Sequence, residues 1–152
     1  MQSVYGVAPS DLISQGPALV EFPAFLGRTV GGAIPIDCNV SVVKLADAGL
    51  INNKLWAWKP VERGYVVSVN PIPFSLLKNH LRRMRQLQDE LGCNRVWPWF
   101  DPRYLKIALN TLNGSDLSNL FGPIQSFGFA VGEQVELYVM QGDQLQIKQV
   151  PA

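Results

Sequence analysis

The apolar and polar positions of residues 95–124 predict a short strand followed by two helices. The aromatic-rich stretch 95–100 predicts the strand, and Pro98 limits its length and favours a sheet edge. Asp101 and Pro102 then predict a helix start. An aspartate carboxylate can accept hydrogen bonds from the free N–H groups of the first turn, and proline is well tolerated there.

Helical spacing of apolar residues continues beyond this start. The first helix is expected to bury Tyr104, Leu105, Ala108, Leu109 and Leu112. Asn113-Gly114 ends that helix, and Ser115 can cap a second one. The second helix is expected to bury Leu117, Leu120 and Phe121 before Gly122-Pro123 ends it.

The rest of the chain predicts further elements with less local detail. Strands are expected over Ala18–Phe22, Tyr65–Val69 and Ser126–Val131, and a helix over Val40–Ala48. Two alternating segments, Gln134–Met140 and Gln144–Val150, flank the turn 141–143 and predict a C-terminal β-hairpin. The order of elements favours an α+β fold in one compact domain over residues 1–152, with a mixed sheet, about four helices and that hairpin.

Positive charge is concentrated in residues 59–106, which hold nine Lys or Arg and four Asp or Glu, a net charge of +5. The remainder of the chain carries −4. The centre of the basic region is a helix predicted over 74–91, with Gly92 as its stop signal. Its buried stripe is expected to be Phe74, Leu77, Leu81, Met84 and Leu91, and its other faces carry Lys78, Arg82, Arg83 and Arg85.

Three interpretations of the basic helix 74–91 remain open. It can be a solvated outer face, a docking face for an acidic partner, or a nucleic-acid contact. The sequence pI of about 7.8 disfavours nucleic acid, because DNA and RNA readers are usually strongly basic domains.

Composition adds an expectation about surface and location. Only 16% of the 152 residues are charged, whereas 47% are hydrophobic, so an exposed apolar patch for a partner is plausible. No apolar run approaches the roughly twenty residues of a membrane span. The start of the chain lacks the pattern of a secretion signal, and Cys38 and Cys93 are expected to be reduced thiols in the cytoplasm.

The segment WPWFDPRYL, followed by LFGPI, resembles the signature of the type VI secretion effector adaptors, also called Tap or Tec chaperones, a domain formerly of unknown function. The matching positions are Trp97, Trp99, Phe100, Asp101, Pro102, Arg103, Phe121, Gly122 and Pro123. The preceding segment GYVVSVNPIPFSLLKNHLRRMRQLQ is similar to the strand and basic helix of that family, and the resemblance is strongest over residues 64–124. Many family members have a longer C-terminal region, whereas this chain continues with the strands expected over 126–150.

The resemblance implies a non-enzymatic adaptor in the cytoplasm of a Gram-negative bacterium. Its partners would be a toxin effector and the VgrG spike protein, and it would need no cofactor or metal. The protein-binding residues are expected to be Trp97, Trp99 and Phe100 together with the basic residues Arg82, Arg83 and Arg85. Asp101, Pro102, Arg103, Phe121, Gly122 and Pro123 are expected to shape the fold.

Catalytic chemistry finds little support in the sequence. His80 is the single histidine and lies among apolar residues of the predicted basic helix, so a packed ring is favoured over a general base. Cys38, His80 and Cys93 lack the close paired spacing of a structural zinc site. The alternatives to an adaptor are a nucleic-acid-binding protein that uses the helix 74–91 and a small hydrolase that depends on His80.

The tryptophans of the chain can have either of two roles. Four tryptophans can close a small core, or some can anchor a partner, where one buried in a pocket contributes about 2 kcal/mol or more. If one is exposed, Trp56 or Trp58 is expected, because their segment has the weakest core pattern.

Overall fold

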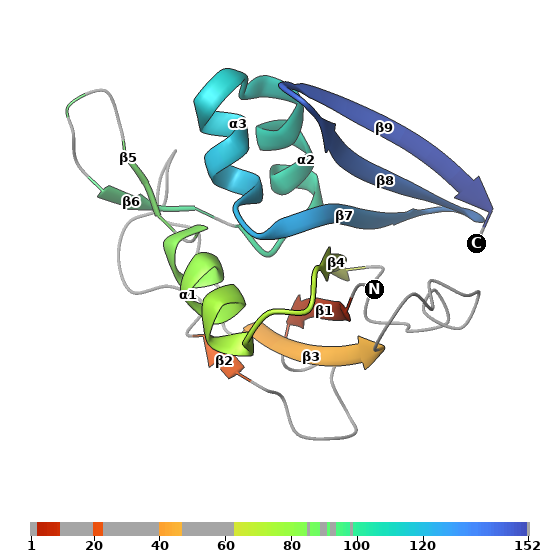
Figure 1. The fold of residues 1–152 in the computed structure, drawn as a ribbon, viewed down its shortest axis with the longest axis horizontal. Helices are drawn as coiled ribbons and strands as arrows, with labels where there is room; N and C mark the ends of the chain where they lie inside the picture. Colours follow the sequence, from red (N-terminus) through yellow and green to blue (C-terminus); the bar gives the residue numbers. More distant parts are fainter. Residues whose placement is uncertain are drawn as a thin grey trace.

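The computed structural model describes residues 3–9, 20–22, 40–46, 63–84, 86–88, 91, 94–97 and 99–151 (Figure 1). The helices are α1 (Phe74–Met84), α2 (Pro102–Thr111) and α3 (Gly114–Phe121). The strands are β1 (Ser3–Pro9), β2 (Val20–Phe22), β3 (Val40–Ala46), β4 (Tyr65–Val69), β5 (Gln86–Gln88), β6 (Asn94–Val96), β7 (Ile124–Val131), β8 (Gln134–Gln141) and β9 (Gln144–Pro151).

Seven of these strands form one sheet in the order β2-β3-β1-β4-β7-β8-β9, and β5 and β6 form a separate pair. The four strands that precede α1 occupy one half of the large sheet, and β7, β8 and β9 follow one another in the other half (Figure 1). The two halves join where β4 pairs with β7. Residues before and after the helices therefore share one sheet.

The three helices pack against one face of this sheet. Residues opposite one another in antiparallel strands share a face. Tyr5, Val67, Phe127 and Tyr138 form such a row from β1 to β8, and all four are buried in the main hydrophobic cluster. The helices contribute Leu77, Leu81, Met84, Leu105, Leu109, Leu117, Leu120 and Phe121 to the same cluster.

The start of α2 is stabilised by the Asp-Pro pair. Asp101 has extended backbone angles, and its Oδ1 accepts the backbone N–H of Arg103 at 2.9 Å, while Pro102 occupies the first turn. This is the cap that the sequence predicts, and such a contact satisfies one of the free donors of a helix start. The turn between the buried Phe100 and the helix is fixed by this local contact.

The predicted mixed sheet with about four helices is wrong. Every strand pairing among the described residues is antiparallel, and those residues form three helices. The helix expected over Val40–Ala48 is instead strand β3, which pairs with β1 and β2. Val40, Val42 and Val43 are β-branched and buried, so pairing with two neighbouring strands outweighs the helical spacing of the segment.

The predicted basic helix is also too long. It ends at Met84 rather than at Leu91, and Gln86–Gln88 forms β5 against β6. Leu91, assigned to the buried stripe, is 87% exposed, whereas Leu77, Leu81 and Met84 are buried as expected. The indole Nε1 of Trp97 donates a hydrogen bond to the backbone O of Met84, which gives a terminal carbonyl of α1 a partner where the helix stops.

The strands predicted after α3 are confirmed, whereas of the strand expected over 95–100 only the first part is observed, as β6 (Asn94–Val96), and residues 99–100 form a turn. β8 and β9 form the expected hairpin, and its eight residue pairs run in register from Gln134 with Pro151 to Gln141 with Gln144. The strand expected over Ser126–Val131 begins two residues earlier, as β7. Strands β1 and β5 were not predicted. Each of the three helices in the described ranges is too short or too polar to cross a lipid bilayer.

Candidate binding cleft between the first and third helices

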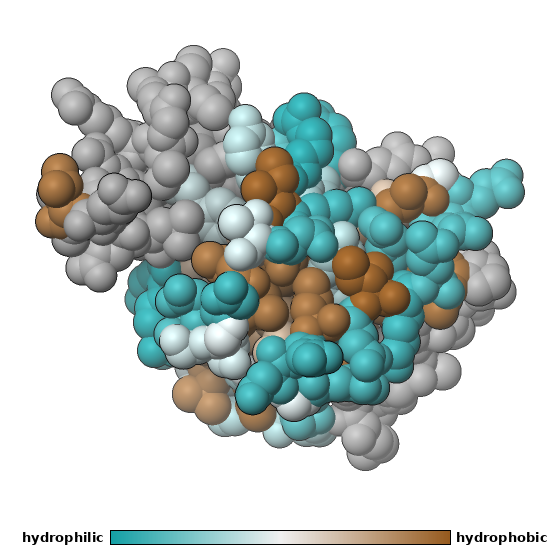
Figure 2. All heavy atoms as spheres, turned by 90° about the horizontal axis from the view of Figure 1, so that it is seen from above, coloured by the Kyte–Doolittle hydropathy of each residue, from teal (hydrophilic) through white to brown (hydrophobic). Residues whose placement is uncertain are grey.

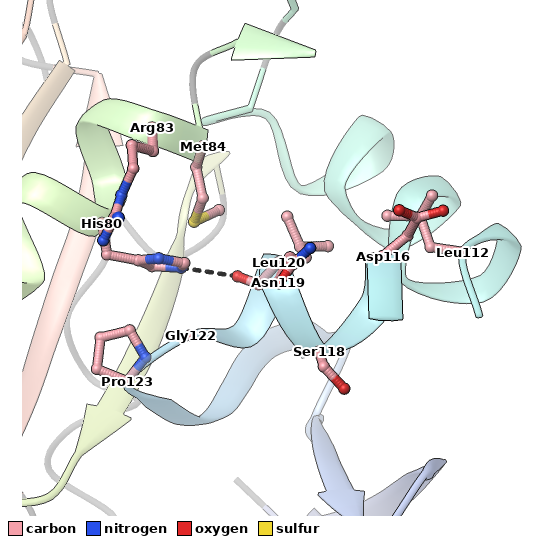
Figure 3. Close-up of a pocket in the computed structure, with 10 residues that line it drawn as sticks. All are labelled: His80, Arg83, Met84, Leu112, Asp116, Ser118, Asn119, Leu120, Gly122 and Pro123. Carbon is pink, nitrogen blue, oxygen red and sulfur yellow. Dashed lines mark hydrogen bonds between the residues drawn. The ribbon is translucent and has the colours of Figure 1, made fainter. Parts of the chain in front are cut away.

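A cleft of about 770 Å³ lies between α1 and the C-terminal end of α3 (Figure 3). Its walls come from segments that the sequence separates widely, and its lining mixes apolar and polar side chains. The lining residues are His80, Arg83, Met84, Leu112, Asp116, Ser118, Asn119, Leu120, Gly122 and Pro123. The cleft therefore lies beside the Phe-Gly-Pro stop that follows α3.

The His80 ring crosses from α1 to the end of α3 (Figure 3). Its Nε2 lies 2.8 Å from the backbone O of Leu120. A carbonyl oxygen can only accept, so Nε2 carries the proton and donates it. Leu120 is in the last turn of α3, where carbonyl groups lack partners inside the helix. His80 therefore satisfies the end of a helix 40 residues further along the chain.

Gly122 lies directly against this ring. Its backbone has φ 50° and ψ −123°, a combination that residues other than glycine rarely adopt. A Cβ at this position would lie 2.4 Å from Cε1 and 2.5 Å from Nδ1 of His80. Only glycine fits both the backbone angle and the close approach of the imidazole.

The environment of His80 favours the neutral ring. Burial lowers the pKa of His80 below its usual value, the hydrogen bond to Leu120 raises it in part, and the positive charge of Arg83 lowers it further. Only 4% of the His80 surface is exposed. The ring is thus a neutral hydrogen-bond donor at neutral pH.

We expect the free energy of unfolding to fall as the pH is lowered below the unfolded-state pKa of His80, about 6.5. The folded pKa is lower than the unfolded one, so the unfolded state binds the proton first. The stabilisation is therefore complete above about pH 6.5 and is lost as the pH falls through the folded pKa. Urea denaturation at a series of pH values above and below 6.5 measures this slope.

The control for this pH series is His80→Gln, whose amide can still donate a hydrogen bond but does not titrate. Because His80 is the only histidine of the chain, the difference in slope between the two proteins reports this ring. Equal slopes in wild type and His80→Gln contradict the assignment of a buried, neutral His80.

The aromatic residues assigned to partner binding lie in the core instead. The exposed fractions are 4% for Trp97, 0% for Trp99 and 5% for Phe100. Trp97 reaches the end of α1 through Met84, and Trp99 packs edge-on against Phe100 with ring centroids 6.2 Å apart. Their apolar surface is used inside the molecule, so the structure offers no support for a surface role of these three side chains.

The basic residues of α1 have a different placement. Arg82 and Arg83 are exposed in the last turn, and Arg83 also lines the cleft. Arg85 lies outside the described residues, as do Trp56, Trp58, Cys38 and Cys93. Of the expected binding residues in the described part of the chain, Arg82 and Arg83 are thus the two that reach solvent.

Of the remaining motif residues, Gly122 and Pro123 line the cleft, whereas Asp101, Arg103 and Phe121 do not. Both carboxylate oxygens of Asp101 contact the Arg103 guanidinium, at 3.1 Å and 2.7 Å, and the Arg103 side chain is 81% exposed. Phe121 is buried and packs edge-on against Phe127 of β7 at 5.0 Å. Asp101 does not line the cleft, so it does not meet His80 there.

Sequence reasoning missed most of the polar cleft wall. Asp116, Ser118 and Asn119 are exposed residues of α3 and were not singled out. The signal was present, because a helix that buries Leu117, Leu120 and Phe121 must turn its intervening polar residues outward. What the spacing could not show is that α1 stands opposite them.

The cleft presents charged and apolar groups that can contact a partner. The His80 Nε2 proton is engaged by Leu120, and Ser118 points away from the ring (Figure 3). In the part of the chain that the structure describes, no three His, Cys, Asp or Glu side chains gather in a way that could hold a metal ion. The arrangement presents Arg83 and Asp116 as charges, and Met84, Leu112 and Leu120 as apolar contacts.

Comparison of the chain with protein-family models, with curated proteins and with solved structures finds no match.

Proposed function

We propose that the protein is a non-enzymatic adaptor that holds a type VI secretion toxin effector and transfers it to the VgrG spike. This proposal starts from the resemblance of WPWFDPRYL and LFGPI to the effector-adaptor signature. The residues of that signature in this chain have shape-forming contacts: Asp101 caps α2, Phe121 packs on β7, and Gly122 fits under His80.

The observation that carries the proposal is the open cleft beside the exposed end of α1. Its apolar residues Met84, Leu112 and Leu120 can contact a partner side chain, while Arg82 and Arg83 add positive charge at the same end. Such charges steer association with an acidic surface and set its orientation. We therefore assign partner binding to the cleft and the last turn of α1, and not to the buried side chains of Trp97, Trp99 and Phe100.

The test is co-purification from the native host with the tagged full chain. We expect a VgrG protein and a toxin effector, identified by mass spectrometry, to be captured by the wild type. Reversing both charges in Arg82→Glu/Arg83→Glu should reduce that capture by at least about tenfold, because a loss of 1.4 kcal/mol already corresponds to that factor. If neither protein is captured by the wild type, the adaptor proposal is overturned.

The matched control is Arg63→Glu. Arg63 is an exposed cation that precedes β4 and does not line the cleft. This variant changes charge in the same direction and should retain wild-type capture. An equal loss in Arg63→Glu assigns the effect to overall charge rather than to the α1 surface.

A further inference from the structure

Within the described residues, strand β9 forms an outer edge of the large sheet. It is last in the strand order and pairs with β8 over eight consecutive residue pairs without a register shift. Among the described residues, no strand pairs with its other side. Half of the backbone N–H and C=O groups of such a strand point away from the sheet, where another strand can bind them.

The sequence of β9 contains few of the features that block edge pairing. Natural edges are usually protected by several charges, by a bulge or by an internal proline. β9, QLQIKQVP, has a single charge at Lys148, and its proline, Pro151, is the last residue of the strand. It is a long, regular and nearly neutral edge.

A partly exposed apolar side chain lies beside this edge. The buried row Tyr5, Val67, Phe127 and Tyr138 continues to Ile147 of β9, which is 45% exposed. Helix α2 contacts β8, where Lys106 pairs with Glu136 at 2.8 Å and Asn110 contacts the Tyr138 hydroxyl at 3.3 Å. In the next strand, β9, Ile147 remains partly exposed.

A second apolar pair extends this surface towards the hairpin turn. Leu145 lies opposite Met140, and both are partly buried against the core. Seen from above Figure 1, the molecule has hydrophobic side chains at its surface inside a border of hydrophilic ones (Figure 2). A partner strand at β9 would cover the outer side of Ile147 and Leu145.

We propose that β9 pairs antiparallel with β9 of a second copy of this chain, so that the two sheets become one. A two-fold axis makes the same strand complementary to itself. Residues opposite one another must share a face of the sheet. The two-fold axis must therefore place one residue of β9 opposite the same residue of the second copy, because an axis between two residues would pair opposite faces. The centre of the interface is then Gln146, Ile147 or Lys148.

Charge and length select Ile147 as the centre. Centring on Lys148 places two like charges directly opposite, which destabilises strand pairing. Centring on Gln146 pairs only the strand residues 144–148. Centring on Ile147 pairs residues 144–150, places Lys148 opposite Gln146 of the second copy, and leaves Pro151 outside the ladder.

This dimer buries the exposed Ile147 against its own copy and contains no interchain ion pair. Its stability should therefore depend little on salt, unlike binding through Arg82 and Arg83. The inference does not rest on the adaptor function, since it follows from the strand alone. Failure of the dimer leaves the adaptor proposal unaffected, and the reverse also holds.

Sedimentation velocity of the purified full chain over a concentration series tests the dimer. We expect a concentration-dependent dimer for the wild type and a monomer for Ile147→Lys at every concentration. The matched control is Val131→Lys, because Val131 is 43% exposed but lies on the interior strand β7; it should dimerise like the wild type. A monomeric wild type, or a dimer unchanged by Ile147→Lys, overturns the proposal.

Disulfide trapping tests the register. Ile147→Cys should form an interchain disulfide under mild oxidation, because position 147 faces itself across the axis. Gln149→Cys should not, since it faces Leu145 of the second copy. Wild type, which contains Cys38 and Cys93, supplies the background in both cases. Trapping of Gln149→Cys in preference to Ile147→Cys contradicts this register.

Discussion

We expect Trp99→Ala to lower the free energy of unfolding by about 3–5 kcal/mol, the range for removing a large aromatic side chain from a core. The Trp99 side chain is fully buried and is among the largest side chains of the hydrophobic cluster. Its removal leaves a cavity and removes the edge-on contact with Phe100. Urea denaturation followed by circular dichroism measures the change.

The control for this substitution is Tyr104→Ala. Tyr104 lies on the neighbouring helix α2 and is 40% exposed, so its loss should cost much less than that of Trp99. A Trp99→Ala protein of wild-type stability that no longer captures its partners would contradict the core role and restore the aromatic segment as a binding surface.

The second large effect is expected for Gly122→Ala, which should lower the free energy of unfolding by roughly 3 kcal/mol. The backbone angles of Gly122 add about 1–3 kcal/mol of strain for any other residue. The new methyl group also collides with His80, and overpacking of this kind costs about 1–3 kcal/mol. Chemical denaturation of the variant gives the total.

Two comparisons separate these contributions. Gly142→Ala introduces a side chain at φ 60° with no atom within 4 Å, so it should show backbone strain without a collision. In a His80→Ala background the ring is absent, and Gly122→Ala should cost less than it does in the wild type. A cost that is equal in both backgrounds would show that the imidazole does not restrict position 122.

Local signals account for the parts of the fold that the sequence predicted well. Tyr65–Val69 forms β4 with the bounds expected, because a run of β-branched residues suits a strand buried on both faces. The turn at Gly142, with φ 60°, produces the C-terminal hairpin. Asp101 caps α2 by a contact only two residues away. In each case the deciding interaction lies within a few residues.

Non-local contacts account for the errors. The segment Val40–Ala46 fits both a helical and a strand pattern, and the neighbouring strands β1 and β2 decide between them. The end of α1 depends on Trp97, which lies 13 residues beyond Met84. Neither partner can be inferred from the spacing inside the segment itself.

The same difference between local and non-local interactions decides which features of the cleft could be predicted. The glycine-proline stop after α3 was expected from sequence, but the reason for glycine at position 122 is the ring of His80. The basic side chains Arg82 and Arg83 were correctly expected at the surface, since helical periodicity turns them away from Leu77 and Leu81. Their position beside the polar residues of α3 required the three-dimensional structure.

The place of β1 between β3 and β4 affects the order in which the chain can fold. Strand β1 is synthesised before both neighbours, and one of its edges stays open until residues 65–69 have left the ribosome. The strands β7 to β9, in contrast, are sequence neighbours joined by two tight turns, and such hairpins form on a timescale of about microseconds. Pairing between segments distant in the sequence makes the first half slower. During biosynthesis β1, the earliest strand, therefore keeps one edge without its partner until β4 emerges, and it is exposed to misassembly for the longest time.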